Sequence, residues 1–325
     1  MNDNNFFSPE ILKLDPNVEV ERISASIRKW LTGFRRKGCV IGLSGGIDSS
    51  VTAALCVQAV GKQRVLGLLM PEKDSSQDTL MLSRLIASNL GIEVVHEEIT
   101  PILEALGCYR RRDEAVKKVL PTYDSNYTCK IVLPSVTKTD SFRIFSVVVV
   151  SPEGKEIKAR LTPDTYLGIV AASNFKQRTR KMLEYYHADR LNYAVAGTPN
   201  LLEYDQGFFV KNGDGAADIK PIAHLYKTQV YQLAEYLDVP EQIRSRPPTT
   251  DTYSAPQTQD EFYFSLTYDK MDLCLYGKNH KVPIAEVARA TGLSDLQVKR
   301  VFRDIEQKRK TTEYLHLSAQ LLKDA

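Results

Sequence analysis

Residues 44–50, with the sequence Ser-Gly-Gly-Ile-Asp-Ser-Ser, combine residue types that suit phosphate binding. The apolar run 39–43 precedes them and a helical spacing of apolar residues follows, so we expect a strand, a glycine turn and a helix start. The first N–H groups of a helix have no internal partners and carry the positive end of the helix dipole. Gly45 and Gly46 let a phosphate approach this backbone closely. Further hydroxyl donors are available from Ser44, Ser49 and Ser50.

Asp48 is the unusual member of this segment, because a carboxylate repels a phosphate unless a divalent cation lies between them. The segment therefore predicts a nucleotide-phosphate site with Mg²⁺. It lacks the lysine of a Walker loop and does not match the dinucleotide-binding fingerprint. A Gly-Gly turn after a strand is often only a tight connection, so the rest of the chain must decide between the two interpretations.

The composition is that of a globular protein with nearly balanced charge. A chain of 325 residues is long enough for one large domain or two small ones. Its 43 basic and 40 acidic residues give a net charge of +3, too balanced to indicate binding to nucleic acid or a membrane. The five cysteines form no CxxC pair, which favours reduced thiols over disulfides or zinc. No apolar segment reaches membrane length, so we expect a soluble, cytoplasmic protein.

Apolar strand patterns alternate with helical patterns over most of the chain. Strands are expected at 39–43, 64–70, 92–96 and 192–196, and helices at 17–34, 80–90, 166–186 and 227–237. This alternation predicts an α/β, Rossmann-like fold with a doubly wound, mostly parallel sheet. Ligands of such sheets bind at the carboxyl ends of the strands, where the segment 44–50 and the polar loop 72–78 both lie.

The alternation is interrupted between about residues 108 and 165. The basic run Arg110–Arg112, a solvated surface patch or a phosphate contact, is followed by strand-like segments at 127–133, 142–150 and 157–161. The turn residues 152–155 predict a hairpin between the last two. We expect a β ribbon inserted into a single domain, 1–325, as a lid over the active site or as an oligomer contact. From about residue 266 the chain should be helical.

Four further segments, in the same order and spacing, resemble the synthetase domain of NAD synthetases. They are 174–182 (Asn-Phe-Lys-Gln-Arg-Thr-Arg-Lys-Met), 197–203 (Gly-Thr-Pro-Asn-Leu-Leu-Glu), 207–215 (Gly-Phe-Phe-Val-Lys-Asn-Gly-Asp-Gly) and 218–229. The segment 44–50 is similar to the pyrophosphate-binding loop of N-type ATP pyrophosphatases, which have an adenine nucleotide alpha-hydrolase-like fold. The resemblance covers residues 18–310, with the β insertion as its main gap.

The resemblance implies ATP-dependent amidation of deamido-NAD to NAD. The nicotinate carboxylate attacks the α-phosphate of ATP, pyrophosphate leaves, and ammonia displaces AMP from the acyl adenylate. Such chemistry depends on positioning and on neutralising the phosphates. There is neither an N-terminal cysteine nucleophile nor room for a glutaminase domain, so we expect free ammonia or ammonia from a separate glutaminase partner. Active sites of the family lie near a two-fold interface, which implies a homodimer.

The resemblance also implies roles for individual residues. ATP or its pyrophosphate would be bound by Ser44, Gly45, Gly46, Ser49, Ser50, Gln77, Thr198, Lys227 and Thr249. Mg²⁺ would be bound by Asp48 and Glu203. Deamido-NAD would be bound by Asn174, Arg178, Lys211, Asp218, Lys308 and Arg309. In catalysis, Asp48 would act through the Mg²⁺ that it binds, and Lys227 would offset the charge that builds on the leaving group. Asp214 would orient or deprotonate ammonium.

Some positions depart from the family pattern. Leu201 and Leu202 stand where smaller or polar residues are usual, and we expect them to reshape the pocket of the reacting carboxylate. The segment 262–264, Phe-Tyr-Phe, replaces a usual leucine-glycine pair. Amidation of a different carboxylate by the same ATP chemistry therefore stays open. Thiolation of tRNA is disfavoured by the lack of a CxxC pair and of a basic excess.

A second alternative is a DNA-binding module. Residues 283–305 have the helix, glycine turn and helix spacing of a helix-turn-helix. The flanking charge is modest, and the same spacing is common in helical hairpins of protein cores. Nucleic-acid binding is therefore disfavoured.

Overall fold

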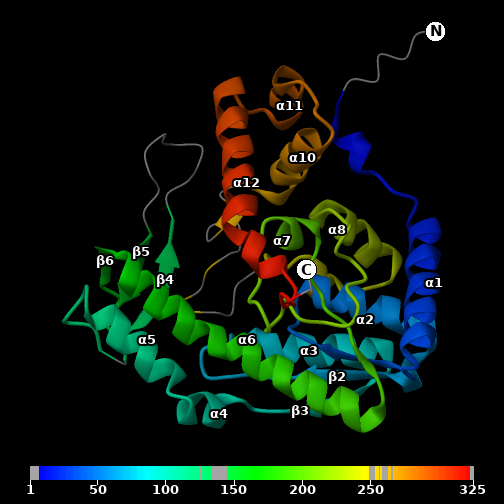
Figure 1. Ribbon diagram of the computed structural model, residues 1–325, viewed down its shortest axis with the longest axis horizontal. Coiled ribbons are helices and arrows are strands. Elements are labelled where there is room, and N and C mark those ends of the chain that lie inside the picture. The colour runs from blue at the N-terminus through cyan, green and yellow to red at the C-terminus, as the bar shows by residue number, and fades with distance from the viewer. Residues whose placement is uncertain are drawn as a thin grey trace.

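The computed structural model describes residues 7–124, 126–133, 145–248, 253–255, 257, 263–264 and 266–322 (Figure 1). Its central element is a parallel sheet with the strand order β3-β2-β1-β7. The strands are β1 (Cys39–Gly42), β2 (Val65–Leu69), β3 (Glu93–His96) and β7 (Ala194–Val195). The four strands expected from the sequence and their parallel pairing are therefore confirmed.

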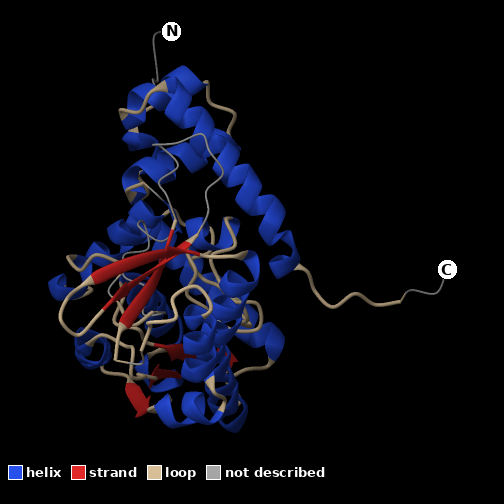
Figure 2. Ribbon diagram, turned by 90° about the vertical axis from the view of Figure 1, so that its left-hand side faces the viewer, coloured by secondary structure: helices blue, strands red, loops and turns tan. Residues whose placement is uncertain are grey.

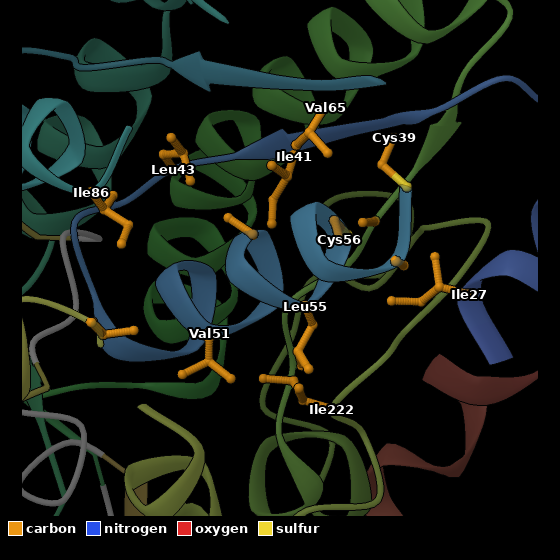
Figure 3. Close-up of a cluster of buried hydrophobic side chains, with 14 of the residues drawn as sticks. Ile27, Cys39, Ile41, Leu43, Val51, Leu55, Cys56, Val65, Ile86 and Ile222 are labelled. Carbon is orange, nitrogen blue, oxygen red and sulfur yellow. The ribbon is translucent and has the colours of Figure 1, made fainter. Parts of the chain in front are cut away.

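Helices cover both faces of this sheet. One face is covered by α1 (Pro16–Phe34), α2 (Ile47–Val60), α3 (Gln77–Leu90) and α8 (Lys227–Tyr236). The other is covered by α4 (Thr100–Ala105), α5 (Cys108–Lys117) and α6 (Pro163–Leu191). Ile41 of β1 packs with Ile27 and Val51 on the first face (Figure 3), whereas Val40 packs with Ala188 on the second. This alternation follows from the two-residue period of a strand, and burial of both faces is usual for a parallel sheet.

The inserted segment contains a second, antiparallel sheet. Its strands are β4 (Thr128–Val132), β5 (Ser146–Val150) and β6 (Glu156–Arg160), in the order β4-β5-β6. The expected hairpin between the last two strands is confirmed. Figure 2 shows the two sheets as separate groups of strands.

The insertion does not begin with β structure at residue 108. Residues 108–117 form helix α5, in which Cys108, Arg112, Ala115 and Val116 are buried at helical spacing. Only a few apolar residues mark this face, because the arginine run occupies the middle of the helix. The first strand of the insertion, β4, then begins at Thr128, in agreement with the strand expected at 127–133.

Helix α6 is the longest helix described, and it exceeds the expected range 166–186 at both ends. Pro163 occupies its first turn, where a proline fits because no N–H is needed there. The Thr162 hydroxyl caps the helix by accepting a hydrogen bond from the N–H of Thr165 at 3.2 Å. At the other end Asn192 adopts the left-handed conformation that commonly ends helices. The helix thus extends from the inserted sheet across the parallel sheet (Figure 1).

The C-terminal part is helical, as expected. Helices α10 (Tyr268–Asn279), α11 (Ile284–Thr291) and α12 (Asp295–His316) share a core with α7 (Leu201–Asp205), and α9 (Glu241–Arg244) follows α8. The pair with helix-turn-helix spacing is α11 and α12, and Val287 and Val298 from its two helices are fully buried in this core. The pair is thus a packed helical hairpin. None of the described helices is long and apolar enough to span a bilayer.

Candidate active site

The turn between β1 and α2 has the shape expected of a phosphate-binding loop. Gly45 has a φ of 69°, and a Cβ there would lie 2.8 Å from the carbonyl oxygen of Thr79. Both the backbone conformation and the approach of α3 therefore require glycine. Gly46 is the N-cap of α2, and its N–H donates to the Ser44 hydroxyl at 3.3 Å. The Ser44 and Ser49 hydroxyls lie 3.1 Å apart beside the start of this helix.

A cavity of about 410 Å³ opens over this turn, at the carboxyl ends of β1 and β2. Its position agrees with the ligand position expected for a parallel α/β sheet. The cavity brings together eight of the residues expected from the sequence, namely Ser44, Gly46, Asp48, Ser49, Asn174, Thr198, Glu203 and Asp214.

Asp48 and Glu203 meet at the base of the cavity with Lys227 and Asn200. The ammonium of Lys227, which is fully buried, contacts the Asp48 carboxylate. The Asn200 side chain donates to the other oxygen of Asp48 at 3.1 Å. Asn200 and Glu203 also cap the start of α7 reciprocally, each accepting a hydrogen bond from the backbone N–H of the other. Asn200, which the sequence did not single out, therefore holds the two carboxylates next to each other.

Asp272 of α10 fixes the position of Lys227. Its carboxylate accepts hydrogen bonds from the backbone N–H of Lys227 at 3.2 Å and of Thr228 at 2.7 Å. A carboxylate at this place caps the N-terminus of α8 from a different helix. Burial raises the pKa of Asp272 to about 6 despite these hydrogen bonds. The C-terminal helices thus help to position the lysine beside Asp48.

The charges at the base of the cavity do not balance. Burial and the neighbouring Asp48 raise the pKa of Glu203 to about 8. Burial alone would lower the pKa of Lys227, but the two carboxylates outweigh it and raise that pKa. Two acids share one lysine, so the donor set suits a further cation such as Mg²⁺, which is usually bound through one or two carboxylates together with substrate phosphates. In the part of the chain that the structure describes, no three acidic, histidine or cysteine side chains form a complete metal cage.

Helix α6 forms one wall of the cavity. Asn174, Gln177, Lys181 and Glu184 line it at spacings of three and four residues, so they lie on one face of the helix. Lys181 and Glu184 form a buried ion pair at 2.5 Å. These two residues were not among those expected from the sequence, although their helical spacing from Asn174 was a usable signal.

Asp214 lies in the cavity wall within the loop that follows α7. It accepts a hydrogen bond from the N–H of Val210 at 2.8 Å, so it also caps the turn in which it stands. Burial raises its pKa, and the nearby Lys181 opposes that shift. The side chain can therefore exchange a proton or hold a small cation in this part of the cavity.

A second buried ionic cluster joins the loop after β2 to α5 and α6. The Lys176 ammonium contacts Glu72 at 2.9 Å and Asp74 at 2.7 Å. Arg112 contacts Asp74 at 2.6 Å, and the Tyr109 hydroxyl donates to Glu72 at 2.7 Å. Arg112 is thus buried inside the protein and is not part of a solvated patch, whereas the neighbouring Arg110 does form an exposed ion pair.

Several of the expected site residues lie outside the cavity lining. Lys227 lies beneath Asp48, Gly45 supports the turn, and Ser50 donates to the carbonyl oxygen of Gly46. Asp218 accepts hydrogen bonds from the N–H of Val195 at 2.7 Å and from a tyrosine hydroxyl, so it stabilises the edge of the sheet. Thr249 lies outside the described residues, and Gln77 is the first residue of α3, with a side chain outside the description.

Three of the expected substrate lysines and arginines hold helix α12 in place. Lys211 donates to the carbonyl oxygens of Tyr314 and Leu317 at 2.7 and 2.8 Å, at the C-terminal end of this helix. Lys308 donates to the carbonyl oxygen of Tyr263 at 2.7 Å. Arg309 forms two hydrogen bonds with an aspartate of α7. Arg178 is exposed and donates to a backbone oxygen, so Asn174 alone of the expected deamido-NAD residues lines the cavity in the described structure.

Leu201 and Leu202 do not reshape the substrate pocket. Leu202 is fully buried, and Leu201 packs beside it against the core of the C-terminal helices. Neither residue lines the cavity. Their size is explained by the packing of α7 against these helices. In the segment 262–264, which also departs from the family pattern, Tyr263 does line the cavity.

Comparison with known proteins decides the family. Residues 19–129 and 141–314 match the family model described as NAD synthase. The chain belongs to this family. It is 59% identical over 316 residues to the NH(3)-dependent NAD(+) synthetase of Rhizobium meliloti (strain 1021), which covers 97% of this chain and 95% of that protein. It is 37% identical over 256 residues to the protein of the same name from Thermotoga neapolitana, covering 78% of this chain and 82% of that protein.

Solved structures share the fold. The NMN synthetase from Francisella tularensis superposes with a TM-score of 0.66 at 24% identity, covering 95% of this chain and 99% of that one. The NH3-dependent NAD synthetase from Campylobacter jejuni superposes with a TM-score of 0.62 at 22% identity, covering 95% of this chain and 100% of that one. At these identities the likeness concerns the fold alone. The residues between the two matched family segments, 130–140, belong to the insertion and begin within β4.

Proposed function

We propose that the protein converts deamido-NAD into NAD by ATP-dependent amidation with ammonia, through an acyl adenylate and with release of AMP and pyrophosphate. The observation that carries this proposal is the joint position of the α2 phosphate site, the Asp48–Glu203 pair and Asp214 in one cavity. The 59% identity to a curated NH(3)-dependent NAD(+) synthetase over 97% of the chain supports the choice of substrates.

The first step takes place at the start of α2. The helix N-terminus and the hydroxyls of Ser44 and Ser49 bind the phosphates that leave. A carboxylate oxygen of deamido-NAD attacks the α-phosphorus, and the bond to the pyrophosphate oxygen breaks. Asp48 and Glu203 would hold Mg²⁺, whose positive charge would stabilise the leaving pyrophosphate. The buried Lys227 ammonium contacts the Asp48 carboxylate from below and orients it.

The second step takes place beside Asp214. The nitrogen of ammonia attacks the acyl carbon, the bond to the AMP oxygen breaks, and the nitrogen loses a proton. A buried carboxylate in the cavity wall can orient ammonium through its charge and accept this proton. The Lys181–Glu184 pair lies next to it and offers both a donor and an acceptor to the nicotinate end of the substrate.

Assembly and location belong to the same proposal. We propose a cytoplasmic homodimer that takes ammonia from solution or from a separate glutaminase. Leu167, Met182 and Tyr186 expose 60%, 58% and 60% of their surface on α6, which supports a contact between two copies along this helix. Sedimentation of Met182→Glu should then show monomers, and an unchanged monomer–dimer distribution would exclude α6 from the interface.

The test is an assay of purified protein with ATP, Mg²⁺, ammonium and deamido-NAD. NAD, AMP and pyrophosphate should form in equal amounts, and glutamine alone should not replace ammonium. Nicotinate mononucleotide is the comparison substrate, because one solved relative is named an NMN synthetase. A screen of other carboxylates completes the assay. Pyrophosphate release that does not depend on deamido-NAD would refute the substrate assignment while leaving the phosphate site intact.

A further inference from the structure

The insertion contributes an aromatic wall to the cavity. Phe145, just before β5, and Tyr166, on α6, both line it. Their rings stack with a centroid distance of 4.3 Å and an interplanar angle of 15°. Val170 and Tyr253 lie in the same wall. The Phe145 and Tyr166 side chains are only partly buried, so each ring retains accessible surface.

The backbone of the insertion holds Phe145 rigidly. Positions 145, 147 and 149 lie on one face of the strand because side chains alternate along it. Val147 and Val149 are buried in the core of the insertion together with Ile169 of α6. The carbonyl oxygen of Phe145 accepts a hydrogen bond from the N–H of Leu161 at 2.9 Å. Phe145 is therefore the residue of this face that projects past the core into the cavity.

This wall lies far from the reacting groups. Glu184 lies beside the end of β1, where the phosphate-binding turn begins, because a Cβ on Gly42 would lie 2.9 Å from its carboxylate oxygen. This end of α6 is therefore the end at which the reaction takes place. Tyr166 stands about five helical turns earlier on the same helix, at a distance of about 27 Å. The nicotinate ring must meet the α-phosphate of ATP at the reacting end. A ring that reaches Phe145 and Tyr166 therefore belongs to the other end of a nucleotide substrate.

We propose that Phe145 and Tyr166 form a stacking platform for the adenine ring of a nucleotide substrate, so that the insertion is part of the substrate site. This inference rests on the proposed function. Both ATP and deamido-NAD carry an adenine, and the shared chemistry is a planar base that stacks on an aromatic side chain. Stacking of this kind changes affinity about tenfold when the aromatic side chain is removed.

Phe145→Leu and Tyr166→Leu test the platform, since leucine keeps an apolar side chain but has no aromatic face. Tyr127→Leu is the matched control, because Tyr127 packs in the same core and is absent from the cavity lining. Phe145→Tyr restores a ring. The KM values for ATP and deamido-NAD and kcat are measured for each variant. We expect the KM of one nucleotide to rise about tenfold in the leucine variants, with kcat nearly unchanged and with recovery in Phe145→Tyr.

The two KM values identify the source of the adenine. A rise for ATP alone places the ATP base on the platform. A rise for deamido-NAD alone places the acyl substrate there, and the preference for deamido-NAD over nicotinate mononucleotide should then shrink by the same factor. Unchanged KM values for both nucleotides in Phe145→Leu would overturn the proposal. An equal rise in Tyr127→Leu would overturn it as well, because that result indicates damage to the insertion.

Equilibrium dialysis separates this proposal from the proposed function. Binding of ATP and of deamido-NAD, each alone, should weaken about tenfold for one of them in Phe145→Leu. Inhibition by inorganic tripolyphosphate, which has no base, should be the same in the wild type and the variant. Weaker inhibition by tripolyphosphate would overturn the platform, since Phe145 would then act on the phosphate end. Failure to form NAD by a wild-type protein that binds both nucleotides would refute the proposed function alone.

Discussion

Two buried ionic clusters each contribute side chains to the cavity lining and differ in how their carboxylates are neutralised. The phosphate-end cluster comprises Asp48, Glu203 and Lys227. The loop cluster comprises Glu72, Asp74, Asp113, Arg112 and Lys176. Each cluster joins segments that are distant in the chain. In the loop cluster Asp74 meets two bases, Lys176 and Arg112, whereas in the described phosphate-end cluster two acids share one base.

The pKa values show what this difference means. Burial would raise the pKa of Asp74, but Lys176 and Arg112 outweigh it and the pKa is lowered. The pKa of Glu203 is instead raised to about 8, since burial and Asp48 act in the same direction. A buried charge is stable when oppositely charged and hydrogen-bonding partners offset the cost of removing it from water. Asp74 is thus neutralised by protein side chains alone, whereas the proposed Mg²⁺ would add positive charge to the phosphate-end cluster. We therefore expect the loop cluster to support stability and the phosphate-end cluster to support turnover.

Lys227→Met should have the largest effect on activity. It leaves Asp48 and Glu203 buried without their ammonium partner, which disturbs both the cation site and the orientation of Asp48. We expect kcat to fall about 1,000-fold, the size of loss seen when one preorganised electrostatic group is removed. Lys220→Met is the control, because Lys220 lies over the ring of Tyr204 and outside both clusters. Equal kcat values for the two variants would contradict the role of Lys227.

Asp48→Asn tests whether the phosphate-end cluster binds the metal. Asparagine keeps the size of the side chain, and its one oxygen can still accept from either Asn200 or Lys227, so folding should be nearly normal. The loss of one carboxylate ligand should lower kcat about 100-fold and raise the Mg²⁺ concentration needed for half-maximal activity. Asp74→Asn is the matched change in the loop cluster and should leave the Mg²⁺ dependence unaltered. If Asp48→Asn also leaves it unaltered, the metal role is wrong.

Lys176→Met should mainly affect stability. Removal of one member of a buried ion pair costs about 3–5 kcal/mol in the free energy of unfolding, which urea titration measures. Tyr109→Phe, which removes one hydrogen bond to Glu72, should cost about 2 kcal/mol and remains measurable if the first variant is unstable. kcat should fall only a few-fold in both. A loss of kcat as large as that of Lys227→Met, in folded protein, would abolish the distinction between the clusters.

The two clusters also differ in how far the sequence predicted them. Residues 44–50 are contiguous, so a strand, a glycine turn and a helix start could be predicted from local pattern and place Ser44 and Asp48 correctly. The loop cluster draws its members from three segments, and only folding brings them together. The arginine run concealed this, since a helix as charged as α5 shows few apolar positions from which its buried face can be identified.

Long basic side chains were the least predictable part of the site. The family resemblance predicts substrate contacts for Lys211, Lys308 and Arg309, and these contacts stay a prediction. The directions of these side chains depend on α12, which continues to His316 and offers its last carbonyl oxygens to Lys211. An ammonium at the C-terminus of a helix is favoured by the helix dipole as well as by hydrogen bonds. Side-chain directions that depend on tertiary contacts leave no local pattern in the sequence.

The smallest expected effect is a difference in pH dependence between the clusters. The pKa of Glu203 is raised from 4.5 to about 8, so its contribution to stability is present below about pH 4.5 and is lost as the pH rises towards 8. The pKa of Asp74 is lowered, so its contribution is present above about pH 4 and is lost in acid. Each group changes the free energy of unfolding by at most about 1.4 kcal/mol per pH unit.

We therefore measure the free energy of unfolding by urea titration, without Mg²⁺ or nucleotide. In the wild type this free energy should fall between pH 5 and 8, and Glu203→Gln should remove part of that fall. It should also fall below pH 4, and Asp74→Asn should remove part of that second fall. Identical pH profiles for the two variants would mean that the charge imbalance at the phosphate end does not exist in the ligand-free protein.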